Sequence, residues 1–241
     1  MYIFLIGFAL SIILAWQACR LSQKGQNRLL IFLAVLFPLS ELGKQILLYI
    51  SDGCSYNWWY FPFQLCSMPM YLLPLYCLIP EKYKKTRLSL ANFLVDFSLL
   101  GGIFAFADSS GMHYSLTVLT IHSYLWHFLM IFLGLFFIFA HKNSTHPKDF
   151  LLPGALFLMF AGIAICLNIV FHANGLINMF YISPYYLMGQ IVFRDIALIT
   201  GQTAGRLIYI ASEICGAFLM HIGSGKVIAF YDSHSKKIKI H

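Results

Sequence analysis

Ionisable and polar side chains stand inside stretches of this sequence that are otherwise apolar. Such groups are costly within a membrane unless they are paired or hydrated, so each one needs an explanation. These residue types can support two kinds of chemistry: a cysteine beside a base can act as a nucleophile, and buried carboxylates can bind protons or ions during transport. The ionisable residues are Glu41, Lys44, Asp96, His122, His127 and Glu213, and Gln64, Cys66, Asn92 and Asn168 add polar capacity.

The same residues also have purely structural explanations. Glu41 and Lys44 are three residues apart, a spacing that allows them to neutralise each other on one helix face. A single cysteine within a membrane usually behaves as a small hydrophobic residue. His122 and His127 are five residues apart and do not face the same way on a helix, so we expect one of them outside any shared cavity. The residue types alone therefore leave a functional site and simple packing both open.

The elements that would position these side chains are long apolar stretches. Each is about 20 residues long, enough for a helix that crosses the hydrocarbon layer. The predicted spans are 2–19, 29–50, 58–79, 88–107, 115–140, 150–173 and 205–222. The segment 175–204 is apolar but irregular, and we expect it to cap the bundle on the outer side as an interfacial or re-entrant segment. The sequence thus predicts one all-α membrane domain, 1–241, with seven transmembrane helices.

The basic residues orient this bundle. Lys and Arg occur in the first, third and fifth gaps and in the tail, whereas the second and fourth gaps carry Asp52 and Asp108 instead. By the positive-inside rule the N-terminus faces out and the C-terminus faces the cytoplasm. In this orientation the polar groups of five helices fall at one level, in the outer half of the membrane, apart from Asp96 nearer the middle. We therefore expect a shared cavity that opens outward.

Composition supports a multi-pass protein of the cell membrane and narrows its partners. The chain is 60% hydrophobic and only 10% charged, which is unusual for a soluble domain. Its net charge of +7 is spread over helix ends, which favours anionic lipid headgroups over nucleic acid. The six cysteines show no spacing typical of a metal site, so we expect neither metal nor cofactor.

Three motifs carry a resemblance to a known family. They are Glu41-Leu-Gly-Lys44-Gln45, the run from Phe61 to Leu72 that contains Gln64-Leu-Cys66, and the run Ile121-His-Ser-Tyr-Leu-Trp-His127; Asn178-Met-Phe-Tyr181 adds a fourth element. Together they resemble the YwaF / transmembrane protein 164 family of integral membrane proteins, over about residues 30–222. The Gln-Leu-Cys motif between Pro62 and Pro69 is the most specific part.

The resemblance implies a function. Eukaryotic relatives are assigned acyltransferase activity on phospholipids, with a cysteine of the third span as proposed nucleophile; here that residue is Cys66, and the family's histidine corresponds to His127. Many relatives have His where this chain has Gln64, which places more of the proton chemistry on His127. In this mechanism Gln64 or Asn178 donates to the oxyanion and Glu41 orients the imidazole. The substrate would be a phospholipid or glycolipid, with a thioester intermediate.

Two other classes of function compete with this one. A small-molecule or lipid transporter or binding protein would use Glu41, Lys44 and Glu213 as its polar site, although the sequence shows no convincing internal repeat of the kind that carriers have. The third class is a structural partner in a membrane assembly. A rhomboid-like serine protease is disfavoured, because no Gly-x-Ser-x-Gly motif lies in a span.

Overall fold

The protein is helical throughout the part of the chain that the structure describes. The computed structural model describes residues 2–238, and no strand occurs among them. The α-helices are α1 (Tyr2–Ala18), α2 (Gln23–Ser51), α3 (Met68–Leu78), α4 (Lys84–Phe93), α5 (Leu99–Phe104), α6 (Thr117–Phe139), α7 (Leu151–Val170), α8 (Phe193–Thr200) and α9 (Gln202–Ile238). Short 3-10 turns are η1 (Trp58–Tyr60), η2 (Leu65–Ser67), η4 (Ser110–Met112), η5 (Pro147–Phe150), η6 (His172–Asn174) and η7 (Met179–Tyr181), and η3 (Leu94–Ser98) is a π-helical turn that joins α4 to α5.

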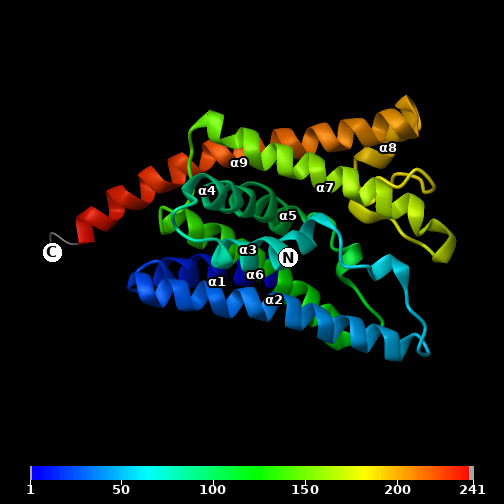
Figure 1. Ribbon diagram of the computed structural model, residues 1–241, viewed down its shortest axis with the longest axis horizontal. Coiled ribbons are helices and arrows are strands. Elements are labelled where there is room, and N and C mark those ends of the chain that lie inside the picture. Colours follow the sequence, from blue (N-terminus) through cyan, green and yellow to red (C-terminus); the bar gives the residue numbers. More distant parts are fainter. Residues whose placement is uncertain (1, 239–241) are drawn as a thin grey trace.

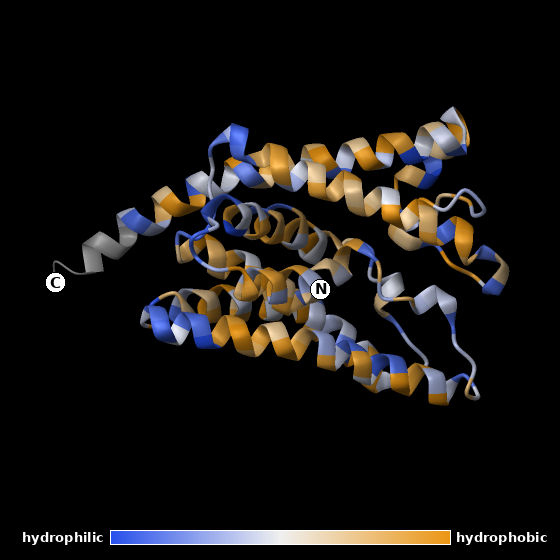
Figure 2. Ribbon diagram, in the orientation of Figure 1, coloured by the Kyte–Doolittle hydropathy of each residue, from blue (hydrophilic) through white to orange (hydrophobic). Residues whose placement is uncertain are grey.

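Five helical segments are long and apolar enough to cross a membrane. They are Gln23–Ser51, Lys84–Phe104, Thr117–Phe139, Pro147–Val170 and Gln202–Ser233. The apolar helices Ile3–Ala18 and Leu65–Leu78 are shorter. Hydrophobic residues run along the outer helices, while hydrophilic residues gather at helix ends and in loops (Figure 2). The protein is therefore an integral membrane protein of apolar helices, and the bilayer is the natural environment of its outer faces.

Several predicted boundaries differ from the observed ones. The third span was predicted to begin at residue 58, but its α-helix begins only at Met68, after the 3-10 turn η2. Pro62 fixes its own φ and has no N–H to donate, which disfavours a regular helix across it, and the chain forms the short turns η1 and η2 on either side. At the other end of the chain, α9 extends to Ile238, well beyond the predicted end at 222. Within 175–204 the helix α8 has eight residues, too few to cross the membrane.

The helices form three layers, as Figure 1 shows. Helices α1 and α2 lie on one side, α7 and α9 on the other, and α3 to α6 lie between them. The central layer is the best buried: 72% of the apolar window in Lys84–Phe104 and 67% of that in α6 are buried, against 22–33% in α2, α7 and α9. Helices α5 and α6 come close because Gly134 has no side chain; a Cβ there would lie 2.8 Å from the Leu99 Cβ.

A buried ion-pairing contact joins the middle layer to α9. Asp96, in the π-helical turn η3, and His221 of α9 are both completely buried, and Oδ2 of Asp96 lies 2.9 Å from Nδ1 of His221. The His221 Nε2 lies 3.1 Å from the carbonyl oxygen of His146, in the loop before α7. A π-helical turn re-aims side chains by one residue relative to an α-helix and often occurs where a polar group must reach a partner. The pair thus links three segments at one buried point.

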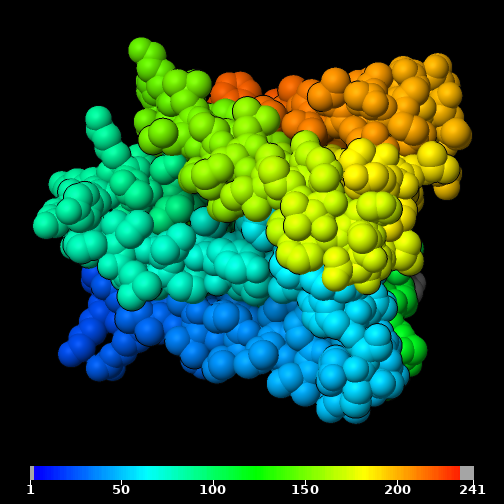
Figure 3. All heavy atoms as spheres, turned by 45° about the vertical axis from the view of Figure 1, so that its right-hand side comes forward, coloured from blue at the N-terminus to red at the C-terminus, as the bar shows by residue number. Residues whose placement is uncertain are grey.

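The opposite end of the bundle is closed by two irregular segments. Residues 51–64 and 171–190 lie against each other on one face (Figure 3). The Trp58 ring stacks on Phe171 with 4.8 Å between ring centroids. A Cβ on Gly175 would lie 3.1 Å from Trp58, and the φ of Gly175 is +154°, so glycine allows the chain to pass this close. These two segments frame a cavity that reaches into the bundle.

Candidate functional site

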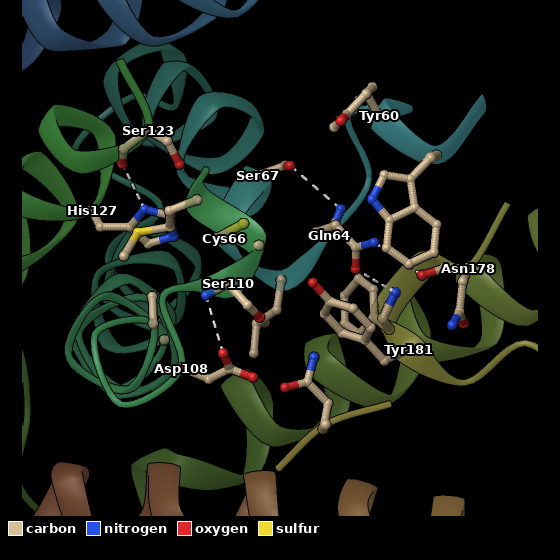
Figure 4. A pocket seen from close by; sticks show the side chains of 18 of the residues that line it. Tyr60, Gln64, Cys66, Ser67, Asp108, Ser110, Ser123, His127, Asn178 and Tyr181 are labelled. Atoms are coloured by element: carbon tan, nitrogen blue, oxygen red, sulfur yellow. Dashed lines mark hydrogen bonds between the residues drawn. The ribbon is translucent and has the colours of Figure 1, made fainter. Parts of the chain in front are cut away.

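A cavity of about 470 Å³ lies between the central layer and the two irregular segments. Its walls come from α2, the segment before α3, the end of α5, the 108–114 loop, the start of α6, the 178–190 segment and the start of α9. Every residue predicted for the site lines it: Glu41, Lys44, Gln64, Cys66, His122, His127, Asn178 and Glu213. The structure therefore brings all eight to one cavity, part of which is drawn in Figure 4. Their chemical roles are a separate question.

Cys66 lies in η2, at the point where the irregular segment turns into α3. The turn is held by two hydrogen bonds: the backbone N–H of Gln64 donates to the Ser67 hydroxyl, and that of Ser67 donates to the Gln64 carbonyl. From α6, the indole N–H of Trp126 donates to the Cys66 carbonyl over 2.9 Å. The fields of Lys44 and Glu41 both act on the thiol. Because Trp126 precedes His127 directly, its hydrogen bond fixes Cys66 against the helix turn that carries the imidazole.

His127 has a defined orientation. Its Nδ1 lies 2.7 Å from the Ser123 carbonyl oxygen, one helical turn earlier, and a carbonyl oxygen only accepts, so Nδ1 carries the hydrogen (Figure 4). In the neutral ring the lone pair is then on Nε2, the nitrogen that a base would use. The expectation that Glu41 orients this ring is wrong, since Ser123 occupies the position. No hydrogen bond joins Cys66 to His127, both of which are among the described residues.

Glu41 is held by neighbours on its own helix. The Lys44 ammonium lies 2.8 Å from Glu41 Oε1, and the Gln45 amide donates to the same oxygen over 2.7 Å. The Gln45 amide also donates to the Tyr60 carbonyl, which attaches the irregular segment to α2. The structural pairing allowed by the spacing is therefore formed, at a place where both charged residues still line the cavity.

Both histidines of α6 line the cavity, which corrects the expectation that one would not. His122, Ser123, Trp126 and His127 all contribute to its wall, and on a helix these four span an arc of about 140°. The cavity wraps around that much of α6. His122 lies against Trp126 with 5.6 Å between ring centroids, and within the described part of the chain neither of its ring nitrogens has a hydrogen-bond partner.

Gln64 and Asn168 hold the 178–183 segment. The Gln64 amide donates to the Asn178 carbonyl and accepts from the Phe180 N–H, at 2.9 and 2.7 Å. The buried Asn168 of α7 does the same with both backbone groups of Met179, at 3.0 and 2.6 Å. One N–H and the oxygen of the Gln64 amide are thus engaged with this segment, so Gln64 positions a loop in addition to lining the cavity.

These amide contacts hold a strained backbone. Phe180 and Tyr181 both have left-handed conformations, with φ of +56° and +57°. Such conformations cost about 1–3 kcal/mol per residue outside glycine and persist only where surrounding contacts impose them. Tyr181 lines the cavity as a result.

We expect Asn168→Leu to destabilise the protein by about 2–4 kcal/mol. The substitution leaves the buried N–H and C=O of Met179 without partners, and each unpaired group costs about 1–3 kcal/mol. Thermal unfolding in detergent measures the effect. Asn27→Leu, at the exposed start of α2, is the matched control and should change the unfolding temperature little. Equal effects of the two substitutions would contradict the role of Asn168 in holding the backbone of Met179.

The site contains groups that the sequence did not single out. Tyr114, Ser123, Trp126, Tyr181 and Tyr209 join the wall, and Asp108 contributes a carboxylate from the loop after α5. The hydroxyl and backbone N–H of Ser110 hydrogen-bond to Asp108 and hold the pKa of its carboxyl below the usual value. Tyr181 belongs to a motif visible in the sequence, but the Ser123 contact depends on the rotamer of His127, which no pattern encodes.

Glu213 enters the cavity from α9. Tyr209, one turn earlier on the same helix, lines the cavity beside it. Among the described residues, no group of three or more His, Cys, Asp and Glu is arranged to hold a metal ion.

Comparison with known proteins assigns the chain to a family. The profile of the TMEM164 family matches residues 1–200, more than four-fifths of the sequence. The chain belongs to the TMEM164 family. No curated protein and no solved structure matches it. The TMEM164 match includes Cys66, His127 and the 178–183 segment but ends before α9, so Glu213 lies outside it.

Proposed function

We propose that this TMEM164-family protein is a lipid acyltransferase of the cell membrane that uses Cys66 as nucleophile and His127 as base. The observation that carries the proposal is the placement of both residues in one cavity, with Nδ1 of His127 occupied by Ser123 and Nε2 left for proton transfer. The substrate is a phospholipid or glycolipid whose ester bond reaches the cavity. The reaction uses no metal or cofactor.

The topology completes this proposal. The five long helices and the two shorter apolar ones together make seven crossings, with the N-terminus outside and the C-terminus in the cytoplasm. The lysines and arginines of the gaps support this orientation. In it the cavity lies in the outer half of the bilayer, near the depth of the glycerol backbone, where the ester bonds of outer-leaflet lipids lie.

The transfer takes place in two steps. His127 Nε2 takes the thiol proton, the Cys66 sulfur bonds to the ester carbonyl carbon, and the π electron pair moves to the oxygen. The tetrahedral species collapses, the C–O bond to the lysolipid breaks, and His127 returns the proton to the leaving oxygen. An acceptor hydroxyl then gives its proton to His127 and attacks the thioester, and the sulfur leaves and is reprotonated.

The test is acyl transfer by the purified chain in vesicles. A phospholipid labelled in its acyl chain serves as donor and an unlabelled lysolipid as acceptor, and mass spectrometry follows the label. The expected result is label in the acceptor at a rate proportional to the protein, and Cys77→Ala, at the far end of α3 from Cys66, should retain it. A rate equal to that of protein-free vesicles for a range of donors would refute the proposal.

A transporter or lipid-binding protein is the second candidate, because Glu41, Lys44 and Glu213 also line the cavity. In that case Glu41→Gln and Glu213→Gln abolish movement or binding of an intact labelled lipid, while Cys66→Ala leaves it unchanged. The acyltransferase proposal expects the reverse dependence on Cys66.

A further inference from the structure

A strained backbone and several hydrogen bonds place the phenol of Tyr181 in the cavity. Two consecutive left-handed residues carry it, and the amides of Gln64 and Asn168 fix the backbone before them. A Cβ on Gly111, across the cavity wall, would lie 3.8 Å from the Tyr181 hydroxyl oxygen. Figure 4 shows the ring beside Gln64 at the edge of the cavity. Strain of this kind is typical of functional sites, where contacts impose one geometry.

The phenol of Tyr181 remains a hydrogen-bond donor at neutral pH. Burial raises its pKa to about 12, so the hydroxyl keeps its hydrogen. Gln190, another residue of the cavity wall, has a smaller effect in the opposite direction.

Tyr181 and Cys66 line the same cavity. An oxyanion that develops on an ester carbonyl bonded to this sulfur would lie in the same space. Gln64, the donor expected from the sequence, uses one amide N–H and its oxygen on the backbone of Asn178 and Phe180.

We propose that Tyr181 is a catalytic residue whose phenol O–H donates a hydrogen bond to the oxyanion formed when Cys66 attacks the lipid ester. This inference rests on the proposed acyltransferase function. The proton remains bonded to the phenol oxygen throughout: the carbonyl π pair moves to the substrate oxygen as the S–C bond forms, and it returns when the C–O bond breaks. Hydrogen bonds aimed at such a charge stabilise the transition state more than the ground state.

The test is Tyr181→Phe in the vesicle assay, because this substitution removes only the hydroxyl. The expected kcat is about 100-fold lower, with KM changed less than about twofold, as for loss of one oxyanion donor. Tyr185→Phe is the matched control in the same segment; its exposed ring stacks on His172 outside the cavity, and it should leave kcat unchanged. Thermal unfolding checks that both variants fold.

A second variant keeps the test independent of folding. A 3-fluorotyrosine incorporated at position 181 retains the hydroxyl and its hydrogen, so it should keep most of the kcat that Tyr181→Phe loses. An unchanged kcat in Tyr181→Phe, a raised KM at unchanged kcat, or a loss of kcat with 3-fluorotyrosine equal to that in Tyr181→Phe would each overturn the role of Tyr181 while acyl transfer itself stands. Absence of transfer by the unmodified protein would overturn both proposals together.

Discussion

Replacing Cys66 by alanine is expected to lower acyl transfer by about 10⁴-fold or more. The thiol is the group that bonds to the acyl chain, so its removal eliminates the covalent route and leaves only the effect of holding two lipids in one cavity. The acyl-enzyme gives a second measurement. With labelled donor and no acceptor, the unmodified protein should carry a hydroxylamine-labile acyl group on the peptide that contains Cys66, and Cys66→Ala should carry none.

The control for this experiment is a cysteine on the same helix. Cys77 lies eleven residues further along, outside the cavity lining, and Cys77→Ala should form the thioester at the normal rate. Transfer that persists at full rate in Cys66→Ala would exclude the nucleophile and favour a binding or transport function. A label on Cys77 instead of Cys66 would contradict the assignment equally clearly.

His127→Asn is expected to lower kcat by about 10²–10⁴-fold, the usual contribution of a general base. Asparagine can place an amide N–H near the position of Nδ1, so the contact with the Ser123 carbonyl is retained, while the Nε2 lone pair is lost. Thioester formation should slow as much as complete transfer, because the proton leaves the thiol in the first step. Single-turnover acylation with excess protein measures this rate.

The matched control is His113→Asn. The Nδ1 of His113 lies 2.7 Å from the Ser109 carbonyl oxygen, the same contact over the same four-residue spacing, but His113 does not line the cavity. Its replacement should leave the rate of acylation unchanged. If His127→Asn acylates Cys66 at the normal rate, another group takes the proton. The candidate is then His122, whose ring nitrogens have no hydrogen-bond partner among the described residues.

Residue type and hydropathy along the sequence are enough to predict the membrane class, the helical stretches and the set of cavity residues. Charges such as Glu41 and Glu213 stand out against apolar neighbours, and the cost of burying them explains why they face a cavity. The start of α3 was less predictable, because Trp58–Phe61 is apolar enough for a span while the structure forms only short 3-10 turns there, beside Pro62, which disfavours a helix. Hydropathy reports burial and not the backbone conformation.

The hydrogen bonds within the site could not be predicted, for a different reason. Gln64 has an amide with two donors and an acceptor, and a sequence does not say whether these face a substrate or a backbone. The structure assigns one donor to Asn178 and the acceptor to Phe180. Likewise, contacts from α7 and from the segment before α3 impose the left-handed conformation of Phe180 and Tyr181. The local sequence therefore does not predict it.

The buried contact between Asp96 and His221 has a consequence for how the chain is assembled. The two residues are 125 positions apart, so during synthesis the third and fourth apolar segments reach the lipid long before the partner imidazole exists. An aspartate at that depth opposes insertion by about 3 kcal/mol. The aspartate in Lys84–Phe104 therefore lacks its partner until α9 emerges from the ribosome. Nascent chains that end before His221 should be the ones that quality-control proteases remove.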